Sequence, residues 1–355
     1  MEKHGADIFT AAKIAGIEEN KIIDFSSNIN PLGIPLSVEK AMINSVKYSN
    51  RYPDINYRSL IKSISLYENV PESFIFPSNG AAEAIFRIAL CLKPKNALLT
   101  APTFSEYESG LKTVECNIKY YNLNEDESFA ITNSIIDEIS GVDIIFICNP
   151  NNPTGQITDN ILLEKIIADC KLNNTTVVVD ECFMDFVVDK EKFSVSHLLN
   201  KYDNLIILKA FTKIFAIPGI RLGYCLTFSK KIIDGLKKAG PPWNVSVVAQ
   251  EAGLAAIEEK QYIIETINFV KEQRKYLIDE IKKLNIKVFE SYANYLFFKF
   301  DYDIDLKEEF IKKGILIRSC ANYNNLSNQY YRIAIKTEKE NKLFIKILKE
   351  IMVNK

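Results

Sequence analysis

The stretch VDIIFICNPNNPTG, residues 142–155, joins a continuous apolar run to a tight turn that its Asn-Pro pairs and glycine impose. An amphipathic segment, residues 159–173, follows this turn. Continuous apolar strands that alternate with helices are typical of a mostly parallel sheet covered by helices on both faces. We therefore predict an α/β fold. The other short apolar runs that support this prediction are residues 96–100, 118–121, 175–180, 204–208 and 222–227.

The bulk composition excludes several classes of function. The 355 residues carry 44 Lys+Arg against 45 Asp+Glu, so net charge gives no reason to expect nucleic acid or an anionic membrane as a partner. No apolar run approaches the roughly 20 residues that a membrane span needs, and the amino terminus lacks a secretory signal. Seven scattered cysteines and two histidines predict reduced thiols, no metal centre and a cytoplasmic protein.

The pattern changes beyond about residue 246 and predicts a second domain. A helical stretch over residues 250–284 precedes short apolar runs and a closing helix. We expect a smaller α+β domain, residues 246–355, joined by an amino-terminal arm, residues 1–47. The large domain would span residues 48–245, with a hinge near the Gly240-Pro241-Pro242 sequence.

Ligands of parallel sheets bind beyond the carboxyl ends of the strands, so residues that follow the apolar runs are candidates for chemistry. Lys213 follows the run at residues 204–208, and Arg221 comes eight residues later. A desolvated lysine has a lowered pKa and becomes a Schiff-base nucleophile, and an arginine can grip a phosphate. Taken alone, the two residues are more often a surface lysine and a loop arginine.

Asp180 ends the run TTVVVD, where a carboxylate could pair with a pyridinium nitrogen or simply cap a turn. Asn152, in the turn described above, could offer its amide to a ligand oxygen. Asn79 is a good N-cap for the helix that opens at SNGAAE, residues 78–83, and the small residues behind it leave backbone N–H groups open to a phosphate. Phe104 and Tyr107 could stack on a flat ring, although core packing is usually the explanation for a lone aromatic.

The order and spacing of these motifs resemble the fold-type I pyridoxal 5′-phosphate (PLP) enzymes of the aminotransferase class I/II superfamily, over nearly the whole chain. The resemblance implies that Lys213 binds PLP as a Schiff base and moves the proton at the substrate Cα. It implies that Asp180 pairs with the pyridine nitrogen and Asn152 with the ring 3-oxygen. The remaining cofactor contacts that it implies come from Gly80, Ala81, Ala82, Phe104, Tyr107, Thr212 and Arg221.

The resemblance also implies a homodimer with shared active sites. Tyr52, in the segment NRYPD, is similar to the tyrosine that reaches the cofactor phosphate of the neighbouring subunit. Arg332, in YYRIAI, is similar to the arginine that binds the substrate carboxylate. Two positions depart from the pattern. Ala210 replaces a hydroxyl residue that bonds the phosphate, and Phe183 replaces a tyrosine that contacts the 3-oxygen, so Asn152 would make that contact alone.

Two groups within the superfamily compete. The segments HGAD (residues 4–7), DECFMDF (180–186) and IRSCANYNNL (317–326) resemble enzymes that decarboxylate L-threonine O-3-phosphate to (R)-1-amino-2-propanol O-phosphate in cobalamin biosynthesis. Ala6 and Ser319 depart from that pattern. The alternative is a histidinol-phosphate aminotransferase or a related enzyme that uses 2-oxoglutarate. A non-catalytic ligand-binding regulator is disfavoured, because such a protein would be free to lose Lys213 and Asp180.

Either reading predicts a small phosphorylated amino acid or amine as substrate. Binding energy from a distal phosphate could set which Cα bond stands perpendicular to the cofactor ring. The candidates for binding the substrate phosphate and carboxylate are His4, Asn30, Arg318 and Arg332.

Overall fold

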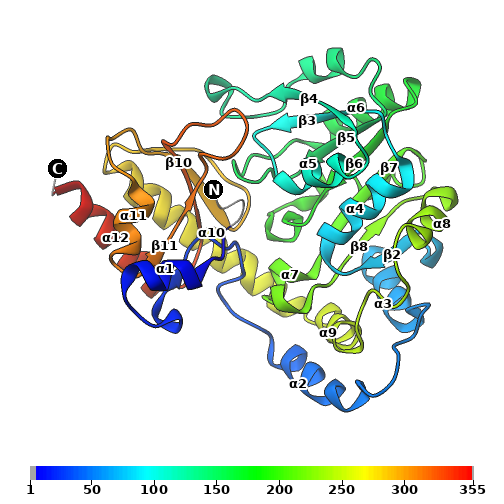
Figure 1. Cartoon of the computed structure of the whole chain (residues 1–355), viewed down its shortest axis with the longest axis horizontal. Coiled ribbons are helices and arrows are strands. Elements are labelled where there is room, and N and C mark those ends of the chain that lie inside the picture. The colour runs from blue at the N-terminus through cyan, green and yellow to red at the C-terminus, as the bar shows by residue number, and fades with distance from the viewer. Residues whose placement is uncertain (1–4, 354–355) are drawn as a thin grey trace.

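The computed structural model describes residues 5–353 of the protein (Figure 1). Its central sheet has seven strands. Their order is β2-β8-β7-β6-β5-β3-β4, and the pairs from β7 to β4 are all parallel. β8 runs antiparallel to both β7 and β2. The strands are β2 (Ile75–Ser78), β3 (Asn96–Ala101), β4 (Asn117–Asn122), β5 (Ile144–Cys148), β6 (Thr176–Asp180), β7 (Leu205–Ala210) and β8 (Gly223–Leu226).

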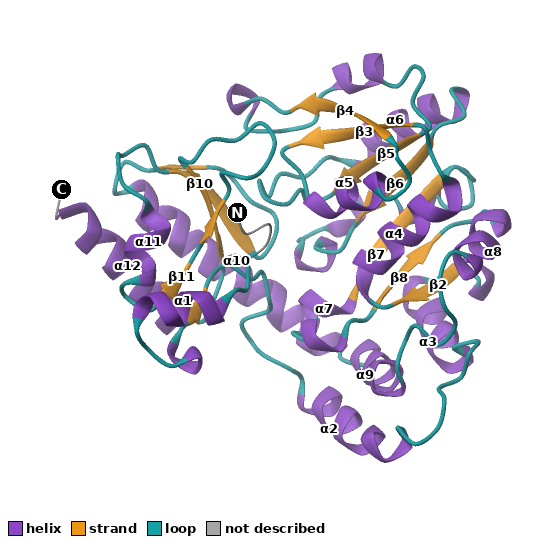
Figure 2. Ribbon diagram, viewed as in Figure 1, coloured by secondary structure: helices purple, strands orange, loops and turns teal. Residues whose placement is uncertain are grey.

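Helices cover both faces of this sheet, as the continuous apolar strands predict (Figure 2). Ile145 and Ile147 of β5 belong to the core on the side of α6, whereas Ile144 and Phe146 belong to the core beneath α4, α5 and α8. Successive strand residues point to opposite faces, so a strand buried on both sides must be apolar throughout. The bounds are α3 (Arg58–Glu68), α4 (Gly80–Leu92), α5 (Ser105–Lys112), α6 (Asn160–Leu172), α7 (Phe211–Ile214), α8 (Lys230–Lys238) and α9 (Val247–Ile257).

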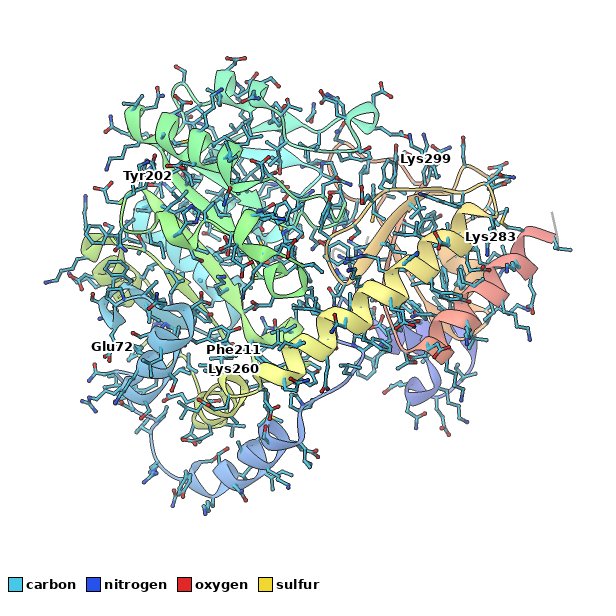
Figure 3. All side chains as sticks on the ribbon, turned by 180° about the vertical axis from the view of Figure 1, so that it is seen from behind. Glu72, Tyr202, Phe211, Lys260, Lys283 and Lys299 are labelled. Carbon is cyan, nitrogen blue, oxygen red and sulfur yellow. The ribbon has the colours of Figure 1, made fainter. Side chains whose placement is uncertain are left out.

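A second, smaller sheet has the order β12-β13-β10-β9 and is antiparallel, and β1 pairs with β11 in parallel beside it. The long helix α10 crosses the back of the molecule from Lys260, near Phe211, to the region of Lys283 in the small domain (Figure 3). The elements are β1 (Ile23–Asp24), β9 (Lys287–Val288), β10 (Tyr295–Lys299), β11 (Ile315–Leu316), β12 (Arg318–Ser319), β13 (Tyr330–Ala334), α1 (Ile8–Ala15), α2 (Leu36–Ser45), α10 (Lys260–Lys282), α11 (Leu306–Ile311) and α12 (Glu338–Val353).

The amino-terminal segment contacts both domains. β1 pairs with β11 in the small domain, whereas α2 packs against α9 beside the large domain. No helix within residues 5–353 has the length and apolarity required to cross a bilayer.

The structure corrects three expectations about local elements. The predicted helix over residues 250–284 is two helices, α9 and α10, because α9 packs on α2 while α10 turns toward the small domain. The strand β2 was not predicted, since Pro77 within it lacks a backbone donor, which an edge strand tolerates. One of the short apolar runs expected in the small domain, residues 315–319, divides into β11 and β12, which belong to different sheets.

Candidate active site

A cavity of about 420 Å³ lies beyond the carboxyl ends of β5, β6 and β7, and residues of both domains line it. Its position is where a mostly parallel sheet places its ligands. The lining contains most of the side chains predicted to bind cofactor or substrate: Ala81, Ala82, Phe104, Asn152, Asp180, Thr212, Lys213, Arg221, Arg318 and Arg332. Ala210 and Phe183, the two positions that depart from the family pattern, also line it.

Lys213 lies in the one-turn helix α7, which begins directly after β7. Burial lowers the pKa of Lys213 to about 8, and the positive charges of Arg332 and Arg221 act in the same direction. A neutral amine is the nucleophilic form of lysine, and it is the form that attacks an aldehyde. The geometry therefore prepares Lys213 for Schiff-base chemistry.

Asp180 ends β6 at the floor of the cavity and is 5% exposed. The Tyr107 hydroxyl donates to Asp180 Oδ2 at 2.6 Å, and the Cys182 N–H donates to Oδ1 at 3.0 Å. Burial raises the pKa of Asp180, although these hydrogen bonds oppose the shift. None of the ion pairs among residues 5–353 includes Asp180, so a protonated ring nitrogen would supply the missing cation.

Tyr107 lies behind Asp180, outside the residues that line the cavity. Its ring is fully buried and stacks on Phe146, with 5.0 Å between the ring centroids. The expected contact between Tyr107 and a cofactor ring is therefore replaced by an indirect one, in which Tyr107 orients the Asp180 carboxylate. Phe104 does line the cavity and meets Tyr107 edge-on.

The amino terminus of α4 and Arg221 together form a phosphate cradle. Gly80, the first residue of α4, has φ +75°, and a Cβ atom there would lie 2.7 Å from Arg221 Nη2. The Asn79 side chain makes no capping hydrogen bond to this helix, so it does not occupy the N–H groups of Ala81 and Ala82. Free N–H groups at a helix start attract anions, and an arginine beside them adds a full charge.

Arg332, on β13, connects the small domain to the turn that carries Asn152. Its Nη1 group donates to Asn152 Oδ1 and its Nη2 group donates to the Ser26 carbonyl at 2.6 Å, while its buried Nε atom has no hydrogen-bond partner among residues 5–353. Because Arg332 occupies the Asn152 oxygen, the Asn152 Nδ2 group is the one left to donate to a ligand oxygen.

Arg318 and Arg332 lie opposite each other on the paired strands β12 and β13. Each is 6% exposed and each lines the cavity. Arg318 Nη2 also donates to Asn322 Oδ1 at 2.8 Å, and its guanidinium lies 5.4 Å from the Tyr323 ring centroid. Two like charges at directly opposite strand positions destabilise a sheet, so this pair points to anionic ligand groups.

Three predicted residues lie away from the cavity or beyond the described chain. Asn30 does not line the cavity: its Nδ2 group donates to Ile214 O at 2.7 Å and to Thr266 Oγ1 at 2.8 Å, and these bonds tie the amino-terminal segment to α7 and α10. Tyr52 is 78% exposed and does not line the cavity of its own chain. His4 lies outside the described residues.

Sequence reasoning missed Asn28, which lines the cavity two residues before Asn30. It is 3% exposed, and its Oδ1 atom has no hydrogen-bond partner within the structure. A buried acceptor without a partner costs free energy, so Asn28 is suited to accept a hydrogen bond from a ligand. The alternation of SSNIN, residues 26–30, could have shown that Asn28 and Asn30 are candidates for the same face.

An aldehyde cofactor with a ring nitrogen and a phosphate would use the lysine, the buried carboxylate and the cradle at once. This combination places the chain among PLP-dependent enzymes of fold type I. The sequence matches the family model of aminotransferase class I and II over residues 20–348, so the chain belongs to that family.

The chain is similar to both groups of enzymes that its motifs suggest. It is 34% identical to the threonine-phosphate decarboxylase of Salmonella typhimurium, over 98% of this chain and 96% of the relative. It is 30% identical to the histidinol-phosphate aminotransferase of Methanococcus aeolicus, over 96% and 93%. Among solved structures, the histidinol-phosphate aminotransferase of Clostridium acetobutylicum has a TM-score of 0.88 at 34% identity and covers 94% of this chain and 100% of its own. The L-threonine-O-3-phosphate decarboxylase of Porphyromonas gingivalis has a TM-score of 0.83 at 25% identity, over 94% and 100%.

Proposed function

We propose that this protein is a PLP-dependent decarboxylase that converts L-threonine O-3-phosphate to (R)-1-amino-2-propanol O-phosphate and CO₂ in cobalamin biosynthesis. The observation that carries the proposal is the pair of opposed arginines, Arg318 and Arg332, in the cavity wall. The decarboxylase of Salmonella typhimurium supports it, as does a 32% identical relative of Leptospira interrogans, an adenosylcobalamin biosynthesis bifunctional protein, of which this chain covers 40%.

The two arginines fit a small substrate that carries two anionic groups. L-Threonine O-3-phosphate is small and carries two anionic groups, a carboxylate on Cα and a phosphate on the neighbouring carbon's oxygen. Opposite residues of an antiparallel pair have Cβ atoms about 5 Å apart, so their side chains can bind two anions of one small molecule. Histidinol phosphate has a phosphate and no carboxylate, but 2-oxoglutarate, the second substrate of the alternative aminotransferase, also carries two anionic groups, so the substrate assay below decides between the two enzymes.

In this proposal the residues of the chain orient the substrate and supply a proton to its Cα atom. PLP, when bound, would supply a ring that accepts the electron pair of whichever Cα bond stands perpendicular to it. In this proposal Arg332 would hold the carboxylate and Arg318 the phosphate, which would orient the C–COO⁻ bond for cleavage. CO₂ would leave without the electron pair of the broken bond, the Cα–H bond would stay intact, and the Lys213 ammonium would donate one proton to Cα in place of the carboxylate. Asp180 keeps the ring nitrogen protonated throughout.

A homodimer in the cytoplasm completes the proposal. Many large apolar side chains between residues 32 and 55 are exposed, among them Leu36, Ile43, Val46 and Tyr52. A second copy of the chain would cover them, and an exposed cluster of this kind marks an interaction surface. In that dimer, the Tyr52 hydroxyl would donate a hydrogen bond to the cofactor phosphate bound in the partner subunit. Light scattering over a dilution series tests this: a protein that is monomeric at all concentrations contradicts the shared-site arrangement.

The first experiment supplies PLP-loaded protein with O-phospho-L-threonine, without any keto acid, and measures CO₂ release. Repeated turnover supports the decarboxylase. No release, together with glutamate formation from histidinol phosphate and 2-oxoglutarate in a parallel reaction, would overturn it in favour of the aminotransferase. Lys213→Ala is the matched control, because it removes the amine from the cavity; it should lose both turnover and the visible absorption of covalently bound PLP.

A further inference from the structure

Tyr52 stands on an exposed segment, and its ring is held by one neighbour. It packs against the Trp243 ring in a tilted arrangement, with 4.6 Å between the ring centroids and 31° between the ring planes. An exposed tyrosine on a loop otherwise samples several rotamers, and ordering it when it binds costs conformational entropy. Trp243 therefore restricts where the Tyr52 hydroxyl can point before any ligand arrives.

Trp243 itself has an unfavourable backbone conformation. Its φ is +57°, in the left-handed region that bulky residues rarely occupy. It is also 40% exposed, so packing in the core does not account for this conformation. Strained residues persist where the surrounding structure fixes them from several sides, and such sites are commonly functional.

Hydrogen bonds on both sides of Trp243 fix the strained loop. Asn244 Nδ2 donates to Glu83 Oε2 at 2.6 Å, and the Asn244 carbonyl accepts from Asn79 Nδ2 at 2.9 Å. On the other side, the Pro241 carbonyl accepts from Arg87 Nη2 at 2.8 Å. These bonds leave the loop little freedom to rotate Trp243 away from Tyr52.

The partners of this loop belong to the start of α4, which forms the phosphate cradle. Glu83 Oε2 also accepts from the Asn79 N–H at 2.6 Å, and Glu83 Oε1 pairs with Arg87 at 2.8 Å. Asn79 and Glu83 flank the cradle residues Gly80, Ala81 and Ala82 in sequence. One rigid network thus fixes both the cradle and Trp243.

We propose that Trp243 is a positioning residue for cofactor binding, which holds Tyr52 so that its hydroxyl meets the phosphate in the partner subunit. The inference rests on the homodimer proposed above. It assigns to residues 240–244 a role in linking the phosphate cradle of one subunit to the tyrosine that serves the other. Trp243 does not touch the reacting atoms in this arrangement, so its effect is on cofactor affinity before it is on the chemical step.

The test measures the dissociation constant of PLP for the dimeric protein and three variants. Tyr52→Phe removes the hydroxyl and keeps the contact between the two rings. Trp243→Ala removes that contact and keeps the hydroxyl. Trp243→Phe keeps a ring at position 243. A hydrogen bond to a charged group corresponds to about tenfold or more in affinity, so Tyr52→Phe should weaken PLP binding by about tenfold. Trp243→Ala should weaken PLP binding by a similar factor, whereas Trp243→Phe should keep most of the wild-type affinity for PLP.

The double variant provides the decisive comparison. If Trp243 acts through the Tyr52 hydroxyl, then Tyr52→Phe combined with Trp243→Ala binds PLP no more weakly than Tyr52→Phe alone. Phe228→Ala is the matched control, because Phe228 is 48% exposed and makes an aromatic pair with Phe74. It should leave PLP affinity unchanged.

Three outcomes would overturn the inference. Wild-type PLP affinity in Trp243→Ala refutes it directly, and so do additive losses in the double variant. If Tyr52→Phe binds PLP normally, the cross-subunit role of Tyr52 fails, and the positioning role fails with it, while CO₂ release still tests the decarboxylase separately. If Trp243→Ala no longer dimerises, Trp243→Leu, which keeps apolar bulk without a ring, replaces it and must show the same loss.

Discussion

The lowered pKa of Lys213 makes a quantitative prediction about how fast PLP attaches to the protein. With a pKa of about 8, roughly one Lys213 amine in ten is neutral at pH 7, against about three in ten thousand for a lysine at the ordinary 10.5. The nucleophilic form is therefore about 300-fold more abundant than at an exposed lysine. The attachment rate should rise about tenfold per pH unit below pH 8 and become flat above about pH 9.

Arg332→Gln tests the electrostatic part of this shift. Burial is the main cause of the lowered pKa of Lys213, and the Arg332 charge is the next. Removing that charge should raise the pKa of Lys213, so attachment becomes severalfold slower at pH 7 and stays unchanged at alkaline pH. Arg318→Gln is the control, because Arg318 lines the same cavity but is not among the causes of the shift.

The assay follows the visible absorption of PLP bound to lysine after mixing it with cofactor-free protein across a pH series. A wild-type midpoint near 10.5 would refute the assignment of a desolvated Lys213. Equal midpoints for the wild type and Arg332→Gln, with both proteins folded, would refute the proposed influence of Arg332. A shift in Arg318→Gln as large as that in Arg332→Gln would show that the effect is not specific.

Two further substitutions test the cradle and the core. Gly80→Ala should weaken PLP binding by tenfold or more in an absorbance titration, since its Cβ would press on the cradle arginine, whereas Gly141→Ala, with φ +76° and open space around it, should bind PLP normally. Glu181→Gln should lower the free energy of unfolding by about 3 kcal/mol in chemical denaturation, because buried Lys209 loses its 2.8 Å partner and keeps only Glu68 at 3.8 Å. Glu164→Gln, in an exposed ion pair, should change it by less than about 1 kcal/mol.

The sequence alone predicted the elements whose signals are local. Strands β5, β6 and β7 each contain an unbroken run of at least three apolar residues because both their faces are covered, and that pattern is visible without any tertiary information. The break between α9 and α10 was not visible, because Glu258 and Glu259 carry no Gly or Pro signal and the two helices separate only because they pack against different partners. The strand β2 was not predicted because it contains Pro77, which lacks a backbone N–H and is unusual in a strand.

The candidate active site likewise contains some residues that local sequence signals predict and others that only tertiary packing places. Lys213, Asp180 and Arg221 follow strands or turns, so their place in the chain predicts their place in space. Asn30 and Asn28 could not be separated, because which of two neighbouring asparagines faces the cavity depends on contacts with α7 and α10, more than 180 residues away. Tyr107 was assigned to a ring contact, yet its hydroxyl bonds the carboxylate behind the ring, and only the packing of α5 on the sheet determines that direction.

The features that violate local preferences gather around one ligand site. Asp180 is a buried carboxylate without an ion pair among the described residues. Arg318 and Arg332 place two positive charges opposite each other on paired strands. Trp243 has a strained backbone. Each costs free energy in the chain by itself, and the costs at Asp180, Arg318 and Arg332 fall when an anionic ligand with a protonated ring nitrogen binds. A fold selected for stability alone would place apolar residues at these positions. Their concentration in and beside one cavity is therefore an argument for cofactor and doubly anionic substrate that is independent of any similarity to known enzymes.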